Sequence, residues 1–255
     1  MKEQRRFKRG SLAAGAIILI ALCLCIITST QAADTWQNEI TIYGWYAGID
    51  GTTNVLTGSG PDISVDASEI LDNLNMIFMG GYEGKYGKWS IIADLVYIDV
   101  GGSADKPALL GANSVDLDIK SWIVNGGVGY ELVQSDRGTL SVVGGVRYLG
   151  LDVEVDLGIM GNPLVERSGS DGMVDGIIGM RGYLRLSDKW YLPYYADIGA
   201  GSSELTWQLF GGVGYRFGWG DIRLGYRYLS YDLGDDKVME DLELSGPLLG
   251  VGFRF

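Results

Sequence analysis

Histidine is absent from the 255-residue chain, and cysteine occurs only twice, as Cys23 and Cys25. Histidine is the side chain best suited to general-base catalysis near neutral pH, so its absence argues against the familiar hydrolytic mechanisms and excludes histidine-bound metals. Proline is scarce, with 5 residues, whereas glycine is abundant, with 40. Because each interior glycine destabilises a helix by about 1 kcal/mol relative to alanine, this composition disfavours a helical fold.

The N-terminal segment has the features of a secretory signal peptide. An uncharged, mostly apolar run at 12–27 is followed by the small residues Ala32 and Ala33, and it is preceded by basic residues: Lys2, Arg5, Arg6, Lys8 and Arg9. We expect cleavage of residues 1–33, with residues 34–255 forming the mature domain; a retained membrane anchor is the alternative. Cleavage removes both cysteines, five basic residues and one acidic residue, which changes the net charge from −12 to −16. Nucleic acid is therefore not an expected partner.

Beyond residue 33, apolar and polar residues alternate with a period of two, which indicates strands with two different faces. In residues 222–228, apolar side chains alternate with Arg223, Gly225 and Arg227, and the same pattern recurs at 178–186. The polar face carries arginine, aspartate and glycine, and the apolar face carries aromatic residues near its ends. Closed barrels satisfy every backbone group within a bilayer, and this alternation is typical of their strands.

Turn signals divide the mature chain into hairpins in which short turns alternate with longer acidic connections. We predict an all-β fold, a closed antiparallel transmembrane β-barrel of ten strands, with eight strands as the alternative. The expected strands are 36–50, 75–86, 88–101, 113–133, 138–156, 171–187, 189–200, 203–217, 220–234 and 239–255. An even number of strands places both termini on the periplasmic side. A short helix beginning at an N-cap is expected at 68–74.

The C-terminal residues 249–255 alternate and end in Phe253 and Phe255. This ending resembles the terminal-strand signal of Gram-negative outer-membrane proteins, which the barrel-assembly machinery recognises. The chain also resembles a largely uncharacterised group of outer-membrane barrels. The stretches that carry this likeness are 43–51, 68–74, 88–99, 225–229 and 245–250. The resemblance implies a barrel in the outer membrane and transfers no catalytic residue.

Charged residues on the polar faces are the candidate functional set. They are Glu83, Lys85, Asp94, Glu131, Arg147, Asp175, Arg181, Arg185, Asp197, Arg216, Arg223, Arg227 and Arg254. Two interpretations remain open. Either the charges pair and plug a narrow lumen, because buried charge is costly unless it is paired, or they line a selective pore.

We therefore expect a structural or surface-interaction role with a plugged lumen, without enzymatic activity, cofactor or bound metal. A narrow, porin-like channel for ions or small solutes is the alternative, and a lipid-modifying enzyme is a remote one. The expected partners are outer-membrane lipid, lipopolysaccharide and the barrel-assembly machinery. Bridging of the acidic loops to lipopolysaccharide phosphates by divalent cations is a further hypothesis.

Overall fold

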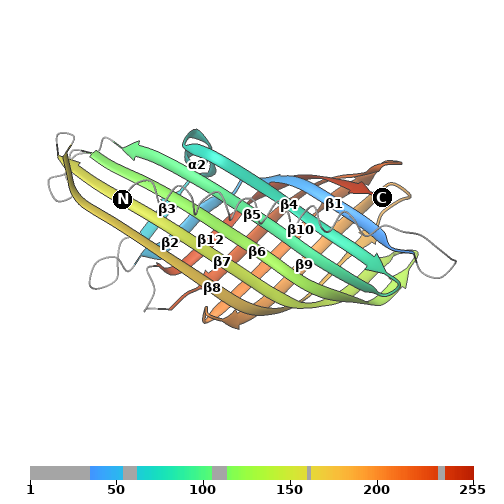
Figure 1. Cartoon of the computed structure of the whole chain (residues 1–255). Helices are drawn as coiled ribbons and strands as arrows, with labels where there is room; N and C mark the ends of the chain where they lie inside the picture. The colour runs from blue at the N-terminus through green and yellow to red at the C-terminus, as the bar shows by residue number, and fades with distance from the viewer. Residues whose placement is uncertain (1–34, 54–61, 105–113, 160–161, 235–238) are drawn as a thin grey trace. The chain divides into compact units, whose positions relative to one another are not determined.

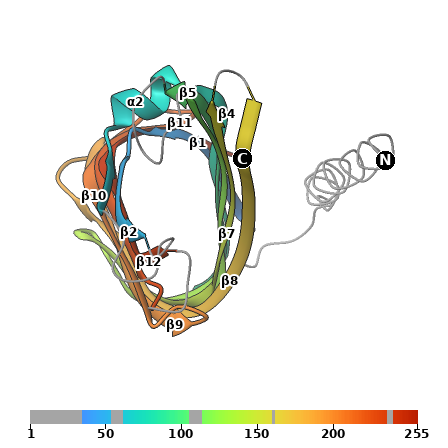
Figure 2. The ribbon, with the colours of Figure 1, turned by 90° about the vertical axis from the view of Figure 1, so that its left-hand side faces the viewer.

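The strands close into an antiparallel ring (Figures 1 and 2). The computed structural model describes residues 35–53, 62–104, 114–159, 162–234 and 239–255, so the expected signal peptide lies outside the described residues. The ring strands are β1 (Gln37–Trp45), β4 (Leu74–Tyr86), β5 (Trp89–Ala104), β6 (Ser114–Ser135), β7 (Gly138–Ile159), β8 (Asn162–Arg185), β9 (Trp190–Gly201), β10 (Leu205–Arg216), β11 (Gly220–Asp232) and β12 (Met239–Arg254).

Pairing of the first and last strands closes the ring, and ten strands take part. β1 pairs with β12 on one side and with β4 on the other. β2 (Gly48–Thr53) continues β1 after a break at Tyr46 and Ala47 and stays paired with β12, so β1 and β2 are two parts of one ring strand. β3 (Asp62–Val65) pairs only with β2, outside the ring. The predicted ten-stranded barrel is confirmed.

The two ends of the barrel differ in their connections. At one end, here called the turn end, short links join β4 to β5, β6 to β7, β8 to β9 and β10 to β11, and both β1 and β12 have their chain-terminal ends there. The opposite end, the loop end, carries the longer connections that lead to β4, β6 and β12, together with two short ones, β7–β8 and β9–β10. β6, β7 and β8 extend beyond the other strands at the loop end (Figure 1). Gly87 has φ 57° in the β4–β5 turn, a left-handed conformation that favours glycine.

Apolar side chains cover the outside of the ring. Aromatic pairs form a girdle near the turn end: Trp36–Tyr86, Trp89–Tyr130, Trp190–Tyr215 and Trp219–Phe253. Tyr97–Trp122 and Trp207–Tyr228 form a second girdle towards the loop end. The girdles are eight residues apart on β5 and on β10, about 27 Å along a strand, which suits the apolar band of a transmembrane barrel. No helix in the described ranges is long and apolar enough to span a membrane.

Three predicted boundaries were wrong. The predicted loop at 157–170 is mostly strand, because the β7–β8 ladder continues to the pair Ile159–Asn162. These strand ends are held by backbone pairing and do not need alternating apolar residues, so the sequence pattern did not predict a strand there. The predicted loop at 51–74 contains β3 and the helix α2 (Ala67–Asp72). The helix begins one residue earlier than predicted, and its N-cap is Asp66, without a side-chain cap hydrogen bond.

The outer face generates a prediction about membrane burial. Leu224 is 60% exposed on β11, about midway between the girdles, beside Val213 and Leu249. We expect Leu224→Arg to lower the free energy of unfolding by about 2–4 kcal/mol in lipid vesicles, because a charge at the bilayer midplane is poorly solvated. Urea unfolding followed by heat-modifiable gel migration measures this. Ser187→Arg, in the exposed β8–β9 link, is the control; equal losses for both variants would contradict the assigned membrane band.

Candidate functional site: the barrel lumen

The lumen contains two layers of side chains, and only the one nearer the turn end is polar. Five strands carry an inward polar residue that is followed, two positions closer to the loop end, by an inward apolar residue. These pairs are Asp94 and Val96, Asn125 and Ile123, Arg147 and Leu149, Asp175 and Met173, and Arg227 and Leu229. The sequence analysis placed the polar faces of the strands in the lumen and did not predict these inward apolar residues nearer the loop end.

The apolar layer fills its part of the lumen. Leu149 and Leu229 are 0% exposed, and Val96, Ile123 and Met173 are each 1% exposed. The whole layer comprises Trp45, Ala47, Met79, Val96, Ile98, Ile123, Leu149, Met173, Leu229, Tyr231, Leu233, Leu242, Leu244 and Leu248. These apolar side chains form one buried cluster across the loop-end part of the lumen.

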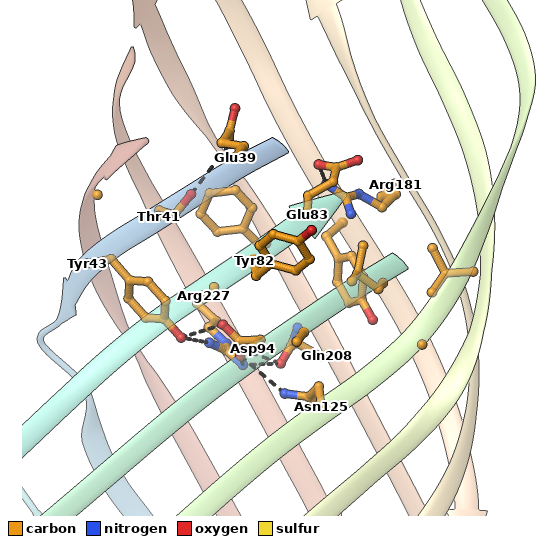
Figure 3. A pocket seen from close by; sticks show the side chains of 18 of the residues that line it. Glu39, Thr41, Tyr43, Tyr82, Glu83, Asp94, Asn125, Arg181, Gln208 and Arg227 are labelled. Carbon is orange, nitrogen blue, oxygen red and sulfur yellow. Dashed lines mark hydrogen bonds and ion pairs between the residues drawn. The ribbon is translucent and has the colours of Figure 1, made fainter. Parts of the chain in front are cut away.

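Arg227 is the first of two arginine centres in the polar layer (Figure 3). Its Nη2 lies 3.0 Å from Asp94 Oδ1, and its Nη1 donates to the Tyr43 hydroxyl at 3.0 Å. Its Nε and Nη2 both donate to Gln208 Oε1, at 3.1 and 2.7 Å. The guanidinium also lies 4.7 Å from the Trp45 ring centroid. One side chain of β11 is thus tied to β1, β5 and β10.

Arg147 is the second centre, and its side chain is fully buried. It donates from Nη2 to Asp197 Oδ2 at 2.5 Å, from Nη1 to Thr206 Oγ1 at 2.9 Å and from Nε to Asn125 Oδ1 at 2.7 Å. Asn125 Nδ2 in turn donates to Asp94 Oδ1 at 3.2 Å. The two centres therefore belong to one hydrogen-bonded network that crosses the lumen.

Further ion pairs lie towards the turn end. Glu83 pairs with Arg181 at 2.5 Å, and Lys85 pairs with Glu131 at 2.6 Å. Glu39 pairs with Arg223, and both are more accessible than Arg147. Arg254 completes this group by pairing with Glu39 at 2.9 Å and also with Asp221. Asp221 also lies 2.7 Å from Arg223 Nε.

These contacts divide the inward charges into groups with a simple balance. Glu83 with Arg181 is neutral, as is Lys85 with Glu131, and Glu39 and Asp221 balance Arg223 and Arg254. Among the described residues, Asp175, Arg185 and Arg216 make no ion pair. The guanidinium of Arg216 instead lies between the Tyr183 and Tyr191 rings, 4.5 and 4.6 Å from their centroids. Asp175 is 1% exposed and accepts a hydrogen bond from the Ser203 backbone nitrogen at 2.9 Å.

A cavity of about 210 Å³ lies on the turn-end side of the apolar layer (Figure 3). Its walls include Glu39, Tyr43, Glu83, Arg181, Arg223 and Arg227. Because the acidic and basic groups of the wall are already paired with one another, the cavity presents a balanced surface. Within the described ranges, no three acidic, cysteine or histidine side chains gather as metal ligands.

The structure places every predicted lumen charge on an inward strand position, but the sequence reasoning missed half of the network. It left out Glu39, Tyr43, Asn125, Thr206, Gln208 and Asp221. Glu39, Tyr43 and Asp221 alternate with outward apolar residues and were detectable from register, whereas nothing local distinguishes a network amide such as Gln208. Phe253 lies on the outer face in the turn-end girdle, and the Phe255 backbone nitrogen donates to Asn38 O at 3.0 Å.

No protein-family model and no curated protein matches the chain. Solved barrels align with it over most of their length. The outer membrane protease OmpT from Escherichia coli is 10% identical, with 89% of this chain and 99% of that chain covered and a TM-score of 0.45. The translocator domain of the autotransporter NalP from Neisseria meningitidis is 16% identical, with 97% and 96% covered and a TM-score of 0.39.

Ail, the attachment invasion locus protein of Yersinia pestis, was solved with the heparin analogue sucrose octasulfate. It is 11% identical, with 87% of this chain and 99% of that chain covered and a TM-score of 0.38. At such values these likenesses assign no ligand or activity. The closed ring, its apolar outer band and its two aromatic girdles make the chain an outer-membrane β-barrel.

The buried Arg147–Asp197 pair generates a prediction about stability. We expect Arg147→Met to lower the free energy of unfolding by about 3–5 kcal/mol, because it leaves the Asp197 carboxylate buried without its partner. The double variant Arg147→Met, Asp197→Leu should recover much of this loss, as measured by urea unfolding midpoints. Arg254→Met, at a pair whose arginine is 42% exposed, should cost less. Additive losses for the two buried substitutions would contradict the coupling.

Proposed function

We propose that this protein is a closed barrel that does not conduct ions and serves a structural or surface-interaction role in the outer membrane. The proposal is supported by two adjacent layers in the lumen, here together called the septum. One is the hydrogen-bonded network of Arg147 and Arg227, and the other is the apolar layer next to it on the loop-end side. A permeating ion would have to break charge-assisted hydrogen bonds and then cross a dry apolar layer, and both steps are unfavourable. The chain also offers no histidine as a catalytic base, so the proposal includes no enzymatic activity.

A narrow channel is the second candidate, and the cavity of about 210 Å³ favours it. The cavity resembles half of a pore, with Glu83, Arg181 and Arg223 on its wall. Conduction would then require the apolar layer to move aside. Ion selectivity in such a channel would depend on the charged wall.

Planar-bilayer recordings test the two candidates. We expect no unitary conductance from the refolded protein, whereas Leu149→Ala and Leu229→Ala combined with Arg227→Gln should conduct, because this triple variant weakens both the apolar layer and the polar network. Heat-modifiable gel migration of the recovered protein is the control that insertion has occurred. Stable openings of the unmodified protein, with a selectivity that changes in Arg227→Gln, would replace the closed barrel by the channel.

We further propose that the turn end and both mature termini face the periplasm and that the loop end faces outward, towards lipopolysaccharide. The short links at the turn end and the longer loops opposite support this orientation. In the same proposal, Phe253 and Phe255 at the end of β12 are the residues that the barrel-assembly machinery recognises. Neither aromatic ring is required by the lumen network, which fits a role outside the folded interior.

Cysteine labelling on intact cells tests the orientation, in a chain whose Cys23 and Cys25 are removed with the leader or replaced. Ser202 lies in the β9–β10 link at the loop end, and Ser187 lies in the β8–β9 link at the turn end; both are exposed. A membrane-impermeant maleimide should label Ser202→Cys and leave Ser187→Cys unlabelled until the outer membrane is permeabilised. Labelling of Ser187→Cys alone on intact cells would reverse the orientation.

A further inference from the structure

The part of the polar layer around Arg147 and Arg227 contains one more negative charge than positive charge. Around the connected centres, the basic groups are Arg147 and Arg227, and the acidic groups are Asp94, Asp175 and Asp197. Two positive charges face three negative ones, so the group carries a net charge of −1. The ion-pair groups at the turn end balance among themselves. An uncompensated carboxylate in a buried site is strongly unfavourable, so something must neutralise it.

The excess charge lies with Asp175. Asp175 is the cross-strand neighbour of Arg147 between β7 and β8, yet the two side chains form no ion pair. Three of the Arg147 nitrogens are directed elsewhere, to Asn125, Thr206 and Asp197. Asp175 Oδ1 accepts from the Ser203 backbone nitrogen, and its Oδ2 has no hydrogen-bond partner among the described residues.

Two other buried oxygens beside Asp175 lack partners as well. Among the described residues, no hydrogen bond reaches Ser203 Oγ or the Tyr231 hydroxyl. Ser203 is 3% exposed and Tyr231 is 0% exposed. Tyr231 stands opposite Thr206, which binds Arg147, and its hydroxyl interacts electrostatically with both aspartates. Native proteins rarely leave so many buried polar atoms unpaired, so this grouping indicates an additional ligand.

The β9–β10 link holds this group of oxygens in place from the loop end. Gly201 N donates to Ser203 O at 3.1 Å, and Ser202 N donates to Val174 O at 3.0 Å. Ser202 Oγ also accepts from Val174 N at 3.1 Å. These bonds fasten the link to β8, so Ser203 is fixed beside Asp175 rather than exposed on a free loop.

We propose that Asp175, Ser203 and Tyr231 bind one small monovalent cation of the size of Na⁺. The site offers only oxygen atoms, which hard cations prefer, and its excess charge is a single unit. A divalent cation would leave an excess positive charge beside the Arg147 guanidinium. A water molecule would satisfy hydrogen bonds but would not neutralise Asp175. The cation joins β8, the β9–β10 link and β11, and so reinforces the septum.

The first test compares urea unfolding of the full mature protein, folded in detergent micelles, in NaCl and in choline chloride of equal concentration. We expect the unfolding midpoint to rise with Na⁺ in a saturable manner. The folding equilibrium constant should increase about 100-fold when Na⁺ is at 100 times its dissociation constant, because the site exists only in the folded state. Identical midpoints in the two salts at all concentrations would overturn the proposal.

Asp175→Asn is the decisive variant, because it removes the charge and keeps the shape. It should fold in choline chloride and lose the response to Na⁺. Glu204→Gln is the matched control, since Glu204 is an exposed acid in the same link and its loss should leave the response unchanged. An Asp175→Asn protein whose unfolding midpoint still rises with Na⁺ like that of the unmodified protein would refute the site. An Asp175→Asn midpoint raised by the same amount in NaCl and in choline chloride would also refute it, because this result indicates that Asp175 is protonated in the unmodified protein.

Ser203→Ala provides an independent measure if Asp175→Asn does not fold. It removes one oxygen without changing the charge, so the Na⁺ concentration at half-maximal response should rise several-fold while the midpoint in choline stays close to that of the unmodified protein. Broadening of the ²³Na resonance by the unmodified protein, reduced in Ser203→Ala, reports binding directly. Unchanged Na⁺ dependence and unchanged broadening in Ser203→Ala would contradict the assigned ligands.

Discussion

Neutralisation of buried charge is the constraint on which the interior of this barrel depends. A ring of ten strands is narrow, so an arginine buried deep in it, such as Arg147 or Arg227, needs acceptors within hydrogen-bonding distance. The partners are far apart in the sequence: Arg227 and Asp94 are separated by 133 residues, and Arg223 and Glu39 by 184. Such pairs form only when the ring has closed in the correct register.

The two layers of the lumen have different consequences. The outer face is apolar and lies against lipid. Apolar contacts with lipid do not specify which strands pair with each other or in which register. The polar layer supplies this specificity, because a register shift of one residue would turn Arg147 and Arg227 towards lipid. The apolar layer adds buried packing around Leu149 and Leu229 on its loop-end side, and this packing does not depend on charge pairing.

Charge balance also distinguishes the parts of the lumen. The turn-end pairs around Glu39 and Glu83 are accessible and neutral as groups, which suits a hydrated vestibule. Arg216 lies unpaired between two tyrosine rings near the same end. The excess negative charge is found deepest, at Asp175, where solvent cannot compensate it. The location of each imbalance therefore matters more than the net charge of the whole chain.

The sequence alone determined the fold class and the ten strands. It did so because successive residues of a membrane-spanning strand face lipid and lumen in turn, which gives most strands a period of two. It failed for β3 and the outer parts of β7 and β8, where neither environment applies and backbone pairing alone sets the strand. It also missed Asn125, Gln208 and Thr206, since an amide or hydroxyl joins a network only through neighbours on other strands.

Only the tertiary structure decided which charges meet. Asp175 and Asp197 are equivalent in sequence terms, both inward aspartates on neighbouring strands. Closure of the ring brings Arg147 to Asp197 at 2.5 Å and leaves Asp175 Oδ2 without a partner. The stagger of the strands also places the apolar residues of five strands in one buried cluster. Alternation along a strand determines whether a residue faces lipid or lumen. Its position along the barrel axis and its contacts with other strands follow from the register around the whole ring.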